Sequence, residues 1–281
     1  MIDYETEYDN RSRVPEHPEI FARWEQEAKA YRAASRAAKL GIRYGGSRRH
    51  AIDLFPAKDD DAMAPIAMFI HGGWWRSLEP AMFSQMARGA NANGVTVAVA
   101  GYDLCPQVSI ADIIEQMRAA CLYLWRRHRK RIFVYGHSAG GHLAACLVAQ
   151  DWAAFASDAP ADLVPAGYGI SGVYDLAPLT QVSPNQDLRL DDAEARRMSP
   201  LHWKVPLDRR FDAIVGSLES SEFLRQSRTL ADNWGGRGIA TRYEEIAGTN
   251  HYTVIDALAD PGSAMTRRVV QMATLTYAMA F

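Results

Sequence analysis

Residues 132–140 read Ile-Phe-Val-Tyr-Gly-His-Ser-Ala-Gly, and small or apolar residues continue from Gly141 to Gln150. The apolar run predicts a buried strand, the glycines a tight turn, and the residues after it a helix. Glycines two positions before and after Ser138 let the strand and helix approach closely, which holds the serine in a strained turn with its hydroxyl exposed. Ser138 is therefore the predicted nucleophile, and the alternative is a glycine-rich turn with an incidental serine.

The residues around this stretch alternate between short apolar runs and helical patterns. The runs are Ile66 to Ile70, Val95 to Val99, Ile132 to Tyr135, Ala166 to Ile170, Ala213 to Val215 and Arg242 to Ile246. Such runs are typical of parallel strands that are buried on both faces. Two extended stretches, Ile42 to Tyr44 and His50 to Phe55, predict a hairpin before them. We expect an α/β fold with a mostly parallel eight-stranded sheet, antiparallel at its start, and helices on both faces.

No linker, repeat or shift in composition divides the chain, so the sequence predicts a single domain over residues 1–281. Two additions surround the sheet. Apolar residues at helical spacing, followed by Gly41, predict a helix over about 18–40 within an N-terminal helical segment, residues 1–40. Residues 172–208 are predicted as a helical and loop insertion near the active site. Residues 59–61, all aspartate, are expected to form an exposed turn after the hairpin.

Composition excludes several classes of protein. The 281 residues carry 31 basic and 33 acidic side chains and are 48% hydrophobic, and no apolar run approaches the roughly 20 residues that span a bilayer. The acidic opening has no signal-peptide pattern, and the three cysteines have no C-x-x-C spacing. We expect a cytoplasmic protein with no membrane association, metal or nucleotide cofactor. Residues 126–131 are basic, which indicates a solvated helix end rather than a nucleic-acid surface in a chain of balanced charge.

Two glycines directly after the strand that ends at Ile70 predict an oxyanion hole. Residues 71–75 read His-Gly-Gly-Trp-Trp. The backbone N–H groups of Gly72 and Gly73, with that of Ala139 after the serine, are expected to face the oxygen that becomes negative during attack on a carbonyl. The alternative is a glycine turn that is capped by core tryptophans.

A serine nucleophile needs a histidine base that is oriented by an acid. In a fold with this order of strands and helices, the three follow one another along the chain as serine, acid and histidine. Three histidines follow Ser138. His251 lies in a turn-forming loop after the last predicted strand, where it can reach the carboxyl edge of the sheet, and is the predicted base. His142 is on the nucleophile's own helix, and His202, beside Trp203, is predicted to be a packing residue.

The acid is expected just past the strand that ends at Val215. Glu219 occupies that loop and is the favoured residue. Glu222 begins the next helix, where a carboxylate is also favourable for the helix dipole, and Asp175 follows an earlier strand. Both stay open as alternatives.

Aromatic residues at the same sheet edge predict a small apolar pocket. Trp74, Trp75 and Tyr102 follow strands at this edge, although each tryptophan is as readily explained by core packing. Arg76 is placed to pair with a substrate carboxylate, or is a surface arginine. The many charges in residues 172–208 argue against a lipase lid.

Several stretches together resemble the α/β-hydrolase superfamily, and within it the arylformamidase (kynurenine formamidase) and small-esterase branch. They are His71-Gly72-Gly73-Trp74-Trp75, Tyr102-Asp103-Leu104-Cys105-Pro106, residues 136–145, Ile170-Ser171-Gly172-Val173-Tyr174-Asp175-Leu176, Ser221-Glu222-Phe223-Leu224-Arg225-Gln226-Ser227 and Asn250-His251-Tyr252. The resemblance implies Ser138 as nucleophile, His251 as base and position 219 as acid, although that position is Asp in the formamidases and Glu219 here.

The resemblance also implies an activity. A serine hydrolase of this branch cleaves small aryl formamides through an acyl-enzyme and needs no metal or organic cofactor. Short-chain carboxylesterase activity is the alternative, and a non-catalytic binding protein of the same fold is the alternative from another class. The expected partner is a small-molecule substrate, and the sequence is also compatible with a homodimer.

Overall fold

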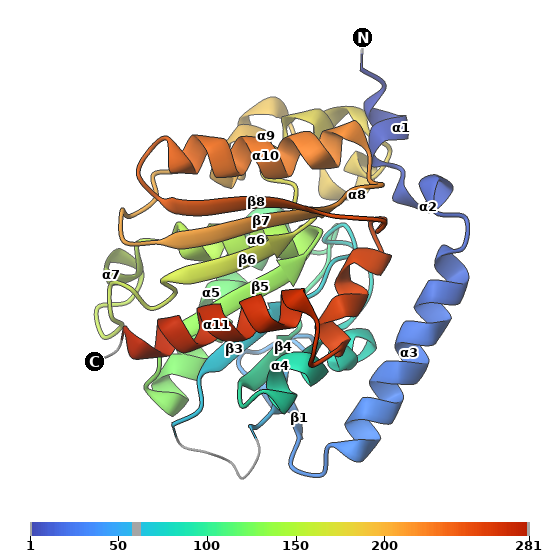
Figure 1. The fold of residues 1–281 in the computed structure, drawn as a ribbon. Coiled ribbons are helices and arrows are strands. Elements are labelled where there is room, and N and C mark those ends of the chain that lie inside the picture. Colours follow the sequence, from blue (N-terminus) through green and yellow to red (C-terminus); the bar gives the residue numbers. More distant parts are fainter. Residues whose placement is uncertain (1, 58–62, 280–281) are drawn as a thin grey trace.

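The centre of the protein is a twisted sheet, seen in a computed structural model that describes residues 2–57 and 63–279 (Figure 1). Its strands are β1 (Lys39–Arg43), β2 (Ala51–Phe55), β3 (Ile66–Ile70), β4 (Thr96–Ala100), β5 (Ile132–His137), β6 (Ala166–Ile170), β7 (Arg210–Gly216) and β8 (Ala240–Ile246). They lie in the order β1-β2-β4-β3-β5-β6-β7-β8. β2 runs antiparallel to both of its neighbours, β1 and β4, and every other pairing among the described strands is parallel. The predicted fold class, an eight-stranded and mostly parallel sheet, is confirmed.

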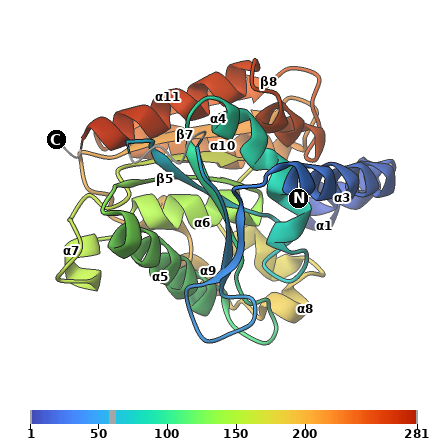
Figure 2. The same ribbon diagram turned by 90° about the horizontal axis from the view of Figure 1, so that it is seen from below.

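Helices cover both faces of the sheet (Figure 2). The α-helices are α1 (Tyr4–Tyr8), α2 (Asn10–Arg13), α3 (His17–Ala34), α4 (Arg88–Ala92), α5 (Ile110–His128), α6 (Ala139–Val148), α7 (Trp152–Phe155), α8 (Asn185–Leu188), α9 (Asp192–Arg197), α10 (Ser221–Gly235) and α11 (Ala264–Ala278). Short 3₁₀ helices are η2 (Pro80–Ala87), η3 (Ala177–Gln181), η4 (Pro200–His202) and η5 (Thr253–Ala259).

Alternation along each strand divides the core into two layers. In β3, Met68 and Ile70 belong to one hydrophobic cluster, together with residues of α5, α6 and α10. Ala67 and Phe69 belong to the other, together with residues of α3, η2 and α11. Successive side chains of a strand point to opposite faces, so an apolar run of five residues requires cover on both sides.

The N-terminal helix is shorter than predicted. α3 ends at Ala34, and the chain continues into β1, which contains Gly41. Gly41 has φ +68, and its N–H donates to the Asp53 carboxylate (2.8 Å) at an irregularity in the pairing of β1 with β2. The glycine therefore serves an irregular strand position and not a helix end. Residues 59–61, predicted as a turn, lie outside the described residues.

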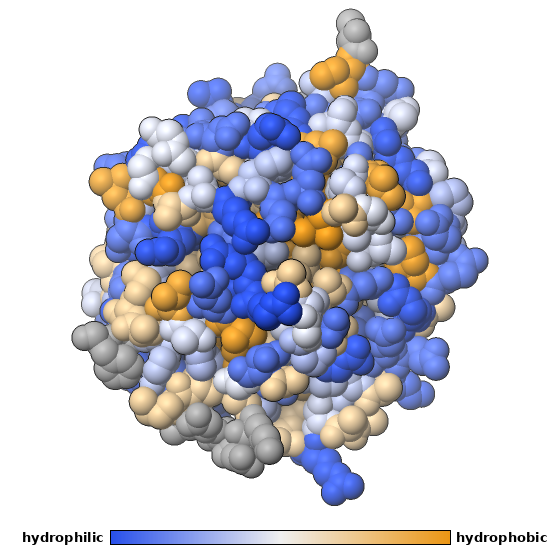
Figure 3. Space-filling view, in the orientation of Figure 1, coloured by the Kyte–Doolittle hydropathy of each residue, from blue (hydrophilic) through white to orange (hydrophobic). Residues whose placement is uncertain are grey.

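The basic run at the end of α5 is held by carboxylates on the segment between α7 and β6. The guanidinium of Arg126 pairs with Asp158 (3.0 Å), and that of Arg131 pairs with Asp162 (2.9 Å). Figure 3 shows a mostly hydrophilic face, on which hydrophobic residues gather in separate small patches. None of the helices in the described residues is long and apolar enough to cross a membrane.

Candidate active site

Ser138 occupies the sharp turn between β5 and α6. Its backbone has φ 56° and ψ −118°, and its N–H donates to the carbonyl of Ile170 (2.8 Å). A Cβ at Gly140 would lie 2.0 Å from the carbonyl oxygen of Ile70, and one at Gly136 would lie 2.2 Å from the carbonyl oxygen of Gly140. Only glycine fits at these two positions, so the turn brings α6 against β3 and keeps the serine in its strained conformation.

A chain of hydrogen bonds joins Ser138 to the predicted base and acid. Ser138 Oγ lies 3.1 Å from His251 Nε2, and His251 Nδ1 lies 2.6 Å from Glu219 Oε2. An ionised carboxylate only accepts, so Nδ1 carries the proton and Nε2 is free to accept one from the serine hydroxyl. All three residues are buried, at 7%, 4% and 8% exposure in the order of the chain of bonds. The arrangement has the geometry of a nucleophile, base and orienting acid.

The carboxylate of Glu219 uses its second oxygen to fix its own position. Oε1 accepts from the backbone N–H of Gly216 (2.7 Å) and from the hydroxyl of Ser171 (2.5 Å). Ser171 follows β6 and has φ 53°, so strain is also present at the end of the neighbouring strand. Because Oε1 is held twice, Oε2 is held toward the imidazole of His251.

The loop after β3 passes directly over the serine. A Cβ at Gly72 would lie 3.0 Å from Ser138 Cβ, and Gly73 has φ +112 with a Cβ position 2.3 Å from the carbonyl oxygen of Ser77. Ala139 is the first residue of α6, where N–H groups have no partner within the helix. The structure thus brings the backbone of all three predicted oxyanion residues beside Ser138.

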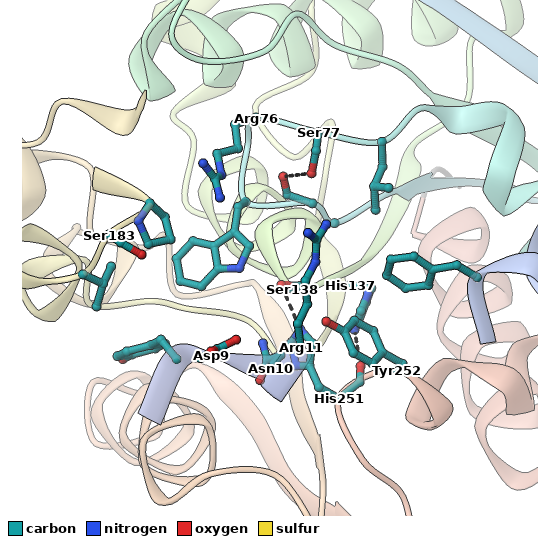
Figure 4. A pocket seen from close by; sticks show the side chains of 18 of the residues that line it. Asp9, Asn10, Arg11, Arg76, Ser77, His137, Ser138, Ser183, His251 and Tyr252 are labelled. Atoms are coloured by element: carbon teal, nitrogen blue, oxygen red, sulfur yellow. Dashed lines mark hydrogen bonds between the residues drawn. The ribbon is translucent and has the colours of Figure 1, made fainter. Parts of the chain in front are cut away.

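Ser138 opens into a cavity of about 180 Å³ (Figure 4). Gly72, Gly73 and Trp74 line it from the loop after β3, and Val182 to Pro184 line it from the insertion. Residues of α1, α2 and α3 supply a further wall: Glu5, Tyr8, Asp9, Asn10, Arg11, Phe21 and Trp24. The N-terminal segment is therefore part of the site.

Residues 67–255 match the protein family that is described as alpha/beta hydrolase fold. This match covers more than half of the chain. The chain belongs to the α/β-hydrolase fold family. The arrangement of its sheet and the position of Ser138 after β5 are those that the family implies.

Individual relatives of this α/β hydrolase include kynurenine formamidases. That of Danio rerio is 25% identical over 243 residues, covering 83% of this chain and 81% of the relative. That of Salmo salar is 27% identical over 241 residues, covering 83% and 81%. A solved structure from Silicibacter sp. TM1040, described provisionally as a thioesterase, is 28% identical with a TM-score of 0.87 and covers 96% of this chain and 100% of its own.

The two alternative acids have other partners in the hydrolase. The carboxylate of Glu222 pairs with Arg225 (2.7 Å) and accepts from the hydroxyl of Tyr8 (3.1 Å). The carboxylate of Asp175 accepts from the N–H of Ala177 (3.2 Å). Neither carboxylate bonds to His251.

The other histidines hold structural positions. His142 is fully buried and bonds to the Met198 carbonyl (2.8 Å), and burial lowers its pKa to about 4. His202 is exposed, so the prediction that it packs in the core is wrong. His137, beside the serine, donates from Nε2 to the carbonyl of His251 (2.7 Å), and burial lowers its pKa well below the usual range. His137 thus stays neutral and holds the loop that carries His251.

The structure places two of the four predicted pocket residues at the cavity. Trp74 and Arg76 line the cavity, but Trp75 and Tyr102 do not. Trp75 is 1% exposed and packs edge-on against His142, with ring centroids 5.0 Å apart. Tyr102 is fully buried, and its hydroxyl donates to the carbonyl of His71 (2.8 Å). Both are core residues, and Tyr102 holds the start of the loop after β3 through the carbonyl of His71.

Arg76 is already paired within the protein. Its guanidinium lies 2.6 Å from the carboxylate of Asp187 in the insertion. This ion pair links the loop after β3 to α8. Of the two interpretations, a surface arginine therefore fits Arg76 better than a partner for a substrate carboxylate.

Sequence reasoning missed two groups of residues at the site. Ser171 lies in one of the family stretches but has no predicted role, although a serine directly after a buried strand at this edge is a usable signal. Residues 3–14 are predicted only as part of a helical addition to the sheet. Asp3 accepts from the N–H of Thr6 and Asp9 from that of Ser12, and these Asp-x-x-Thr and Asp-x-x-Ser pairs are helix-start signals. They predict helices α1 and α2, but not where those helices pack.

Proposed function

We propose that this protein is a serine hydrolase that cleaves small aryl formamides, N-formylkynurenine-like, through an acyl-enzyme. The observation that carries the proposal is the bonded series from Ser138 through His251 to Glu219 at the wall of the cavity. Relatives with 25–27% identity that are named kynurenine formamidases support the choice of formamides.

In the first half of the reaction, Ser138 Oγ attacks the formyl carbon while its proton moves to His251 Nε2. Glu219 stabilises the imidazolium that forms. The N–H groups of Gly72, Gly73 and Ala139 stabilise the negative oxygen of the tetrahedral intermediate. His251 then gives the proton to the leaving amine nitrogen, the C–N bond breaks, and a formyl ester remains on Ser138.

Water completes the reaction by the same route. His251 accepts a proton from water as the water oxygen attacks the formyl carbon, and returns it to Ser138 Oγ when formate leaves. No step requires a metal or organic cofactor.

The cavity favours a small substrate with an aromatic group. About 180 Å³ accommodates a compact acyl compound, and Tyr8, Trp74 and Phe21 supply aromatic walls. Short acyl esters are the second candidate, because the same groups stabilise attack on an ester, and the provisional thioesterase resembles this chain over nearly its whole length.

A substrate panel tests the proposal. kcat/KM is measured for N-formylkynurenine and for p-nitrophenyl esters from acetate to decanoate, with Ser138→Ala as the control. We expect high formamide rates and ester rates that fall steeply beyond about six acyl carbons. Formamide rates far below those of short esters favour the esterase, a preference for long chains rejects both activities, and no turnover of any compound favours a binding protein.

A further inference from the structure

Two arginines, Arg11 and Arg76, line the cavity beside Ser138. They differ in their surroundings. Arg76 is neutralised by Asp187 at 2.6 Å. For Arg11, no carboxylate of residues 2–57 or 63–279 lies within ion-pair distance of the guanidinium.

The acidic residues of the cavity are engaged elsewhere. Asp9 accepts from the backbone N–H (3.1 Å) and the hydroxyl (2.5 Å) of Ser12, and the hydroxyl bond is the main reason that its pKa is lowered. Glu5 accepts from the backbone N–H and the hydroxyl of Ser183, both at 2.6 Å. Asp9 therefore begins α2, and Glu5 ties α1 to the insertion. Among the described residues, Arg11 is the cation of this lining whose guanidinium has no carboxylate at ion-pair distance, although its charge contributes to the lowered pKa of Asp9.

The side chain of Arg11 extends from α2 across the cavity, in front of Ser138 in the view of Figure 4. It lies near the hydroxyl of Tyr252, the residue after the base. Burial raises the pKa of Tyr252 to about 12, and the charge of Arg11 opposes this rise. The hydroxyl of Tyr252 accepts a hydrogen bond from Arg11 and stays protonated at neutral pH, so it adds no negative charge beside the guanidinium. The other N–H groups of the guanidinium are available to a ligand.

The short helices that carry Arg11 are fixed to α10 by side-chain hydrogen bonds. The hydroxyl of Tyr8 bonds to Glu222 (3.1 Å) and accepts from Gln226 (2.8 Å), and Tyr8 is 2% exposed. Glu7 accepts from the N–H of Glu222 (3.0 Å) at the start of α10. A guanidinium on such a support can bind a carboxylate through two parallel hydrogen bonds.

We propose that Arg11 binds a carboxylate of the substrate, so that the preferred substrate is an aryl formamide or ester that also carries an acidic group. This inference rests on the proposed hydrolase function and narrows it to anionic substrates. Binding through Arg11 places the carboxylate over the cavity and the scissile carbonyl between Ser138 and the oxyanion loop. A neutral compound of the same shape lacks this anchor.

The kinetic test compares an aryl formamide that bears an amino-acid carboxylate with the same compound as its primary amide. Arg11→Gln is expected to lower kcat/KM about 10- to 100-fold for the carboxylate, mainly through KM, and less than about threefold for the amide. Arg11→Lys should recover part of the loss. Equal effects on both compounds, or no effect on either, overturn the proposal.

Two further variants test the competing explanations, which are disturbance of the N-terminal segment and an anion site at Arg76. Arg13→Gln removes a cation of the same helix that pairs with Glu7 and does not line the cavity, so it reports on disturbance of the segment. Arg76→Gln tests the other cavity arginine. A selective loss for the carboxylate compound in Arg76→Gln, but not in Arg11→Gln, moves the anion site to Arg76 and rejects the proposal.

A binding measurement separates failure of this inference from failure of the proposed function. The calorimetric Kd of 3-phenylpropionate is compared with that of 3-phenylpropionamide in the Ser138→Ala protein, with and without Arg11→Gln. Preference for the carboxylate that Arg11→Gln abolishes supports the anion site even if no formamide or ester is hydrolysed. Absence of any preference rejects the anion site even if Ser138-dependent hydrolysis is found.

Discussion

The candidate catalytic centre and the N-terminal wall of the same cavity are held in different ways. At the centre, Ser138 and Ser171 adopt positive φ, and glycines allow backbone to touch backbone. At the wall, residues 3–14 are fixed by side chains such as Glu5, Glu7 and Tyr8, which bond to the insertion and α10.

This difference assigns different tasks to the two regions. Backbone strain and close packing fix atoms to within fractions of an ångström, which proton transfer and oxyanion stabilisation require. Side-chain bonds on helices of four or five residues tolerate substitution, so the wall can change which compound fits without altering the reaction. If the proposed function holds, we expect the chemistry to depend on the sheet edge and the choice of substrate to depend on the wall.

The largest effect is expected at the nucleophile. Ser138→Ala should lower kcat by about 10⁴-fold or more, while the free energy of unfolding changes by less than about 1 kcal/mol. A serine-directed phosphonate should label the wild type once, at Ser138, in mass spectrometry of the digested protein. Labelling at another residue, or full turnover by the variant, contradicts the role of the centre.

Exchange of the acid should come next. Glu219→Gln should lower kcat by about 10³- to 10⁴-fold, because a neutral amide does not stabilise the imidazolium of His251. Glu222→Gln and Asp175→Asn are the matched controls and should change kcat less than about tenfold. If either control lowers kcat as much as Glu219→Gln does, Glu219 is not the residue that orients His251.

Two adjacent tryptophans test which side chains belong to the core and which to the cavity. Trp75→Ala should destabilise the protein by about 3–5 kcal/mol, since it empties a fully packed core site. Trp74→Ala should cost less stability and instead raise KM, since Trp74 lines the cavity. Chemical denaturation and steady-state kinetics on both variants distinguish these outcomes, and equal stability losses would place Trp74 in the core as well.

Ser171 tests how tightly the acid must be held. Ser171→Ala removes the hydroxyl that donates to Glu219 Oε1 at 2.5 Å. A hydrogen bond to a charged group contributes about 1.5–3 kcal/mol, so kcat should fall about 10- to 100-fold with KM nearly unchanged. Ser171→Thr, which keeps the hydroxyl, should recover part of the rate, and a loss confined to KM would assign Ser171 to substrate contact.

The last prediction concerns the dependence of stability on pH, far from the candidate nucleophile. Burial lowers the pKa of His71 to about 3 and of His142 to about 4, below the value of about 6.5 that an unfolded chain has. Between these values the unfolded chain binds a proton that the folded chain does not. Stability is therefore complete above about pH 6.5 and declines as the pH falls toward 4, by up to about 1.4 kcal/mol per pH unit for each histidine.

Urea unfolding between pH 4.5 and 7.5 measures this slope. His142→Gln keeps a donor for the carbonyl of Met198 and should reduce the slope by about one proton. His202→Gln, at an exposed site, should leave the slope unchanged. An unchanged slope in His142→Gln would show that His142 does not resist protonation.

Local pattern was enough to predict the sheet and to select three residues that the structure brings into hydrogen-bond contact. Apolar runs report burial on both faces, and G-x-S-x-G reports a close approach of backbones, so Ser138, Glu219 and His251 could be placed by position after their strands. Local pattern did not distinguish Trp74 from Trp75. Both have positive φ, 56° and 52°, and the direction of each side chain depends on how the loop turns between His71 and Ser77.

The wall was missed for another physical reason. Its helices are short, and their position depends on partners such as Ser183 and Gln226, far away in the sequence. Arg11 has the appearance of an ordinary surface arginine until those contacts are known. Conversely, the end of α3 was misjudged because Gly41 is as suitable for an irregular strand position as for a helix end.

The contact of Tyr8 with the start of α10 also bears on the order in which the protein folds. Its hydroxyl meets Glu222 and Gln226, which follow it by 214 and 218 residues, so closing that loop has a large entropic cost until the rest of the sheet is assembled. During refolding, Ser138 and His251 should come together before Arg11 arrives. We expect a brief interval in which the protein hydrolyses acyl compounds with little discrimination, and selectivity for its own substrate appears only when the first residues of the chain dock last.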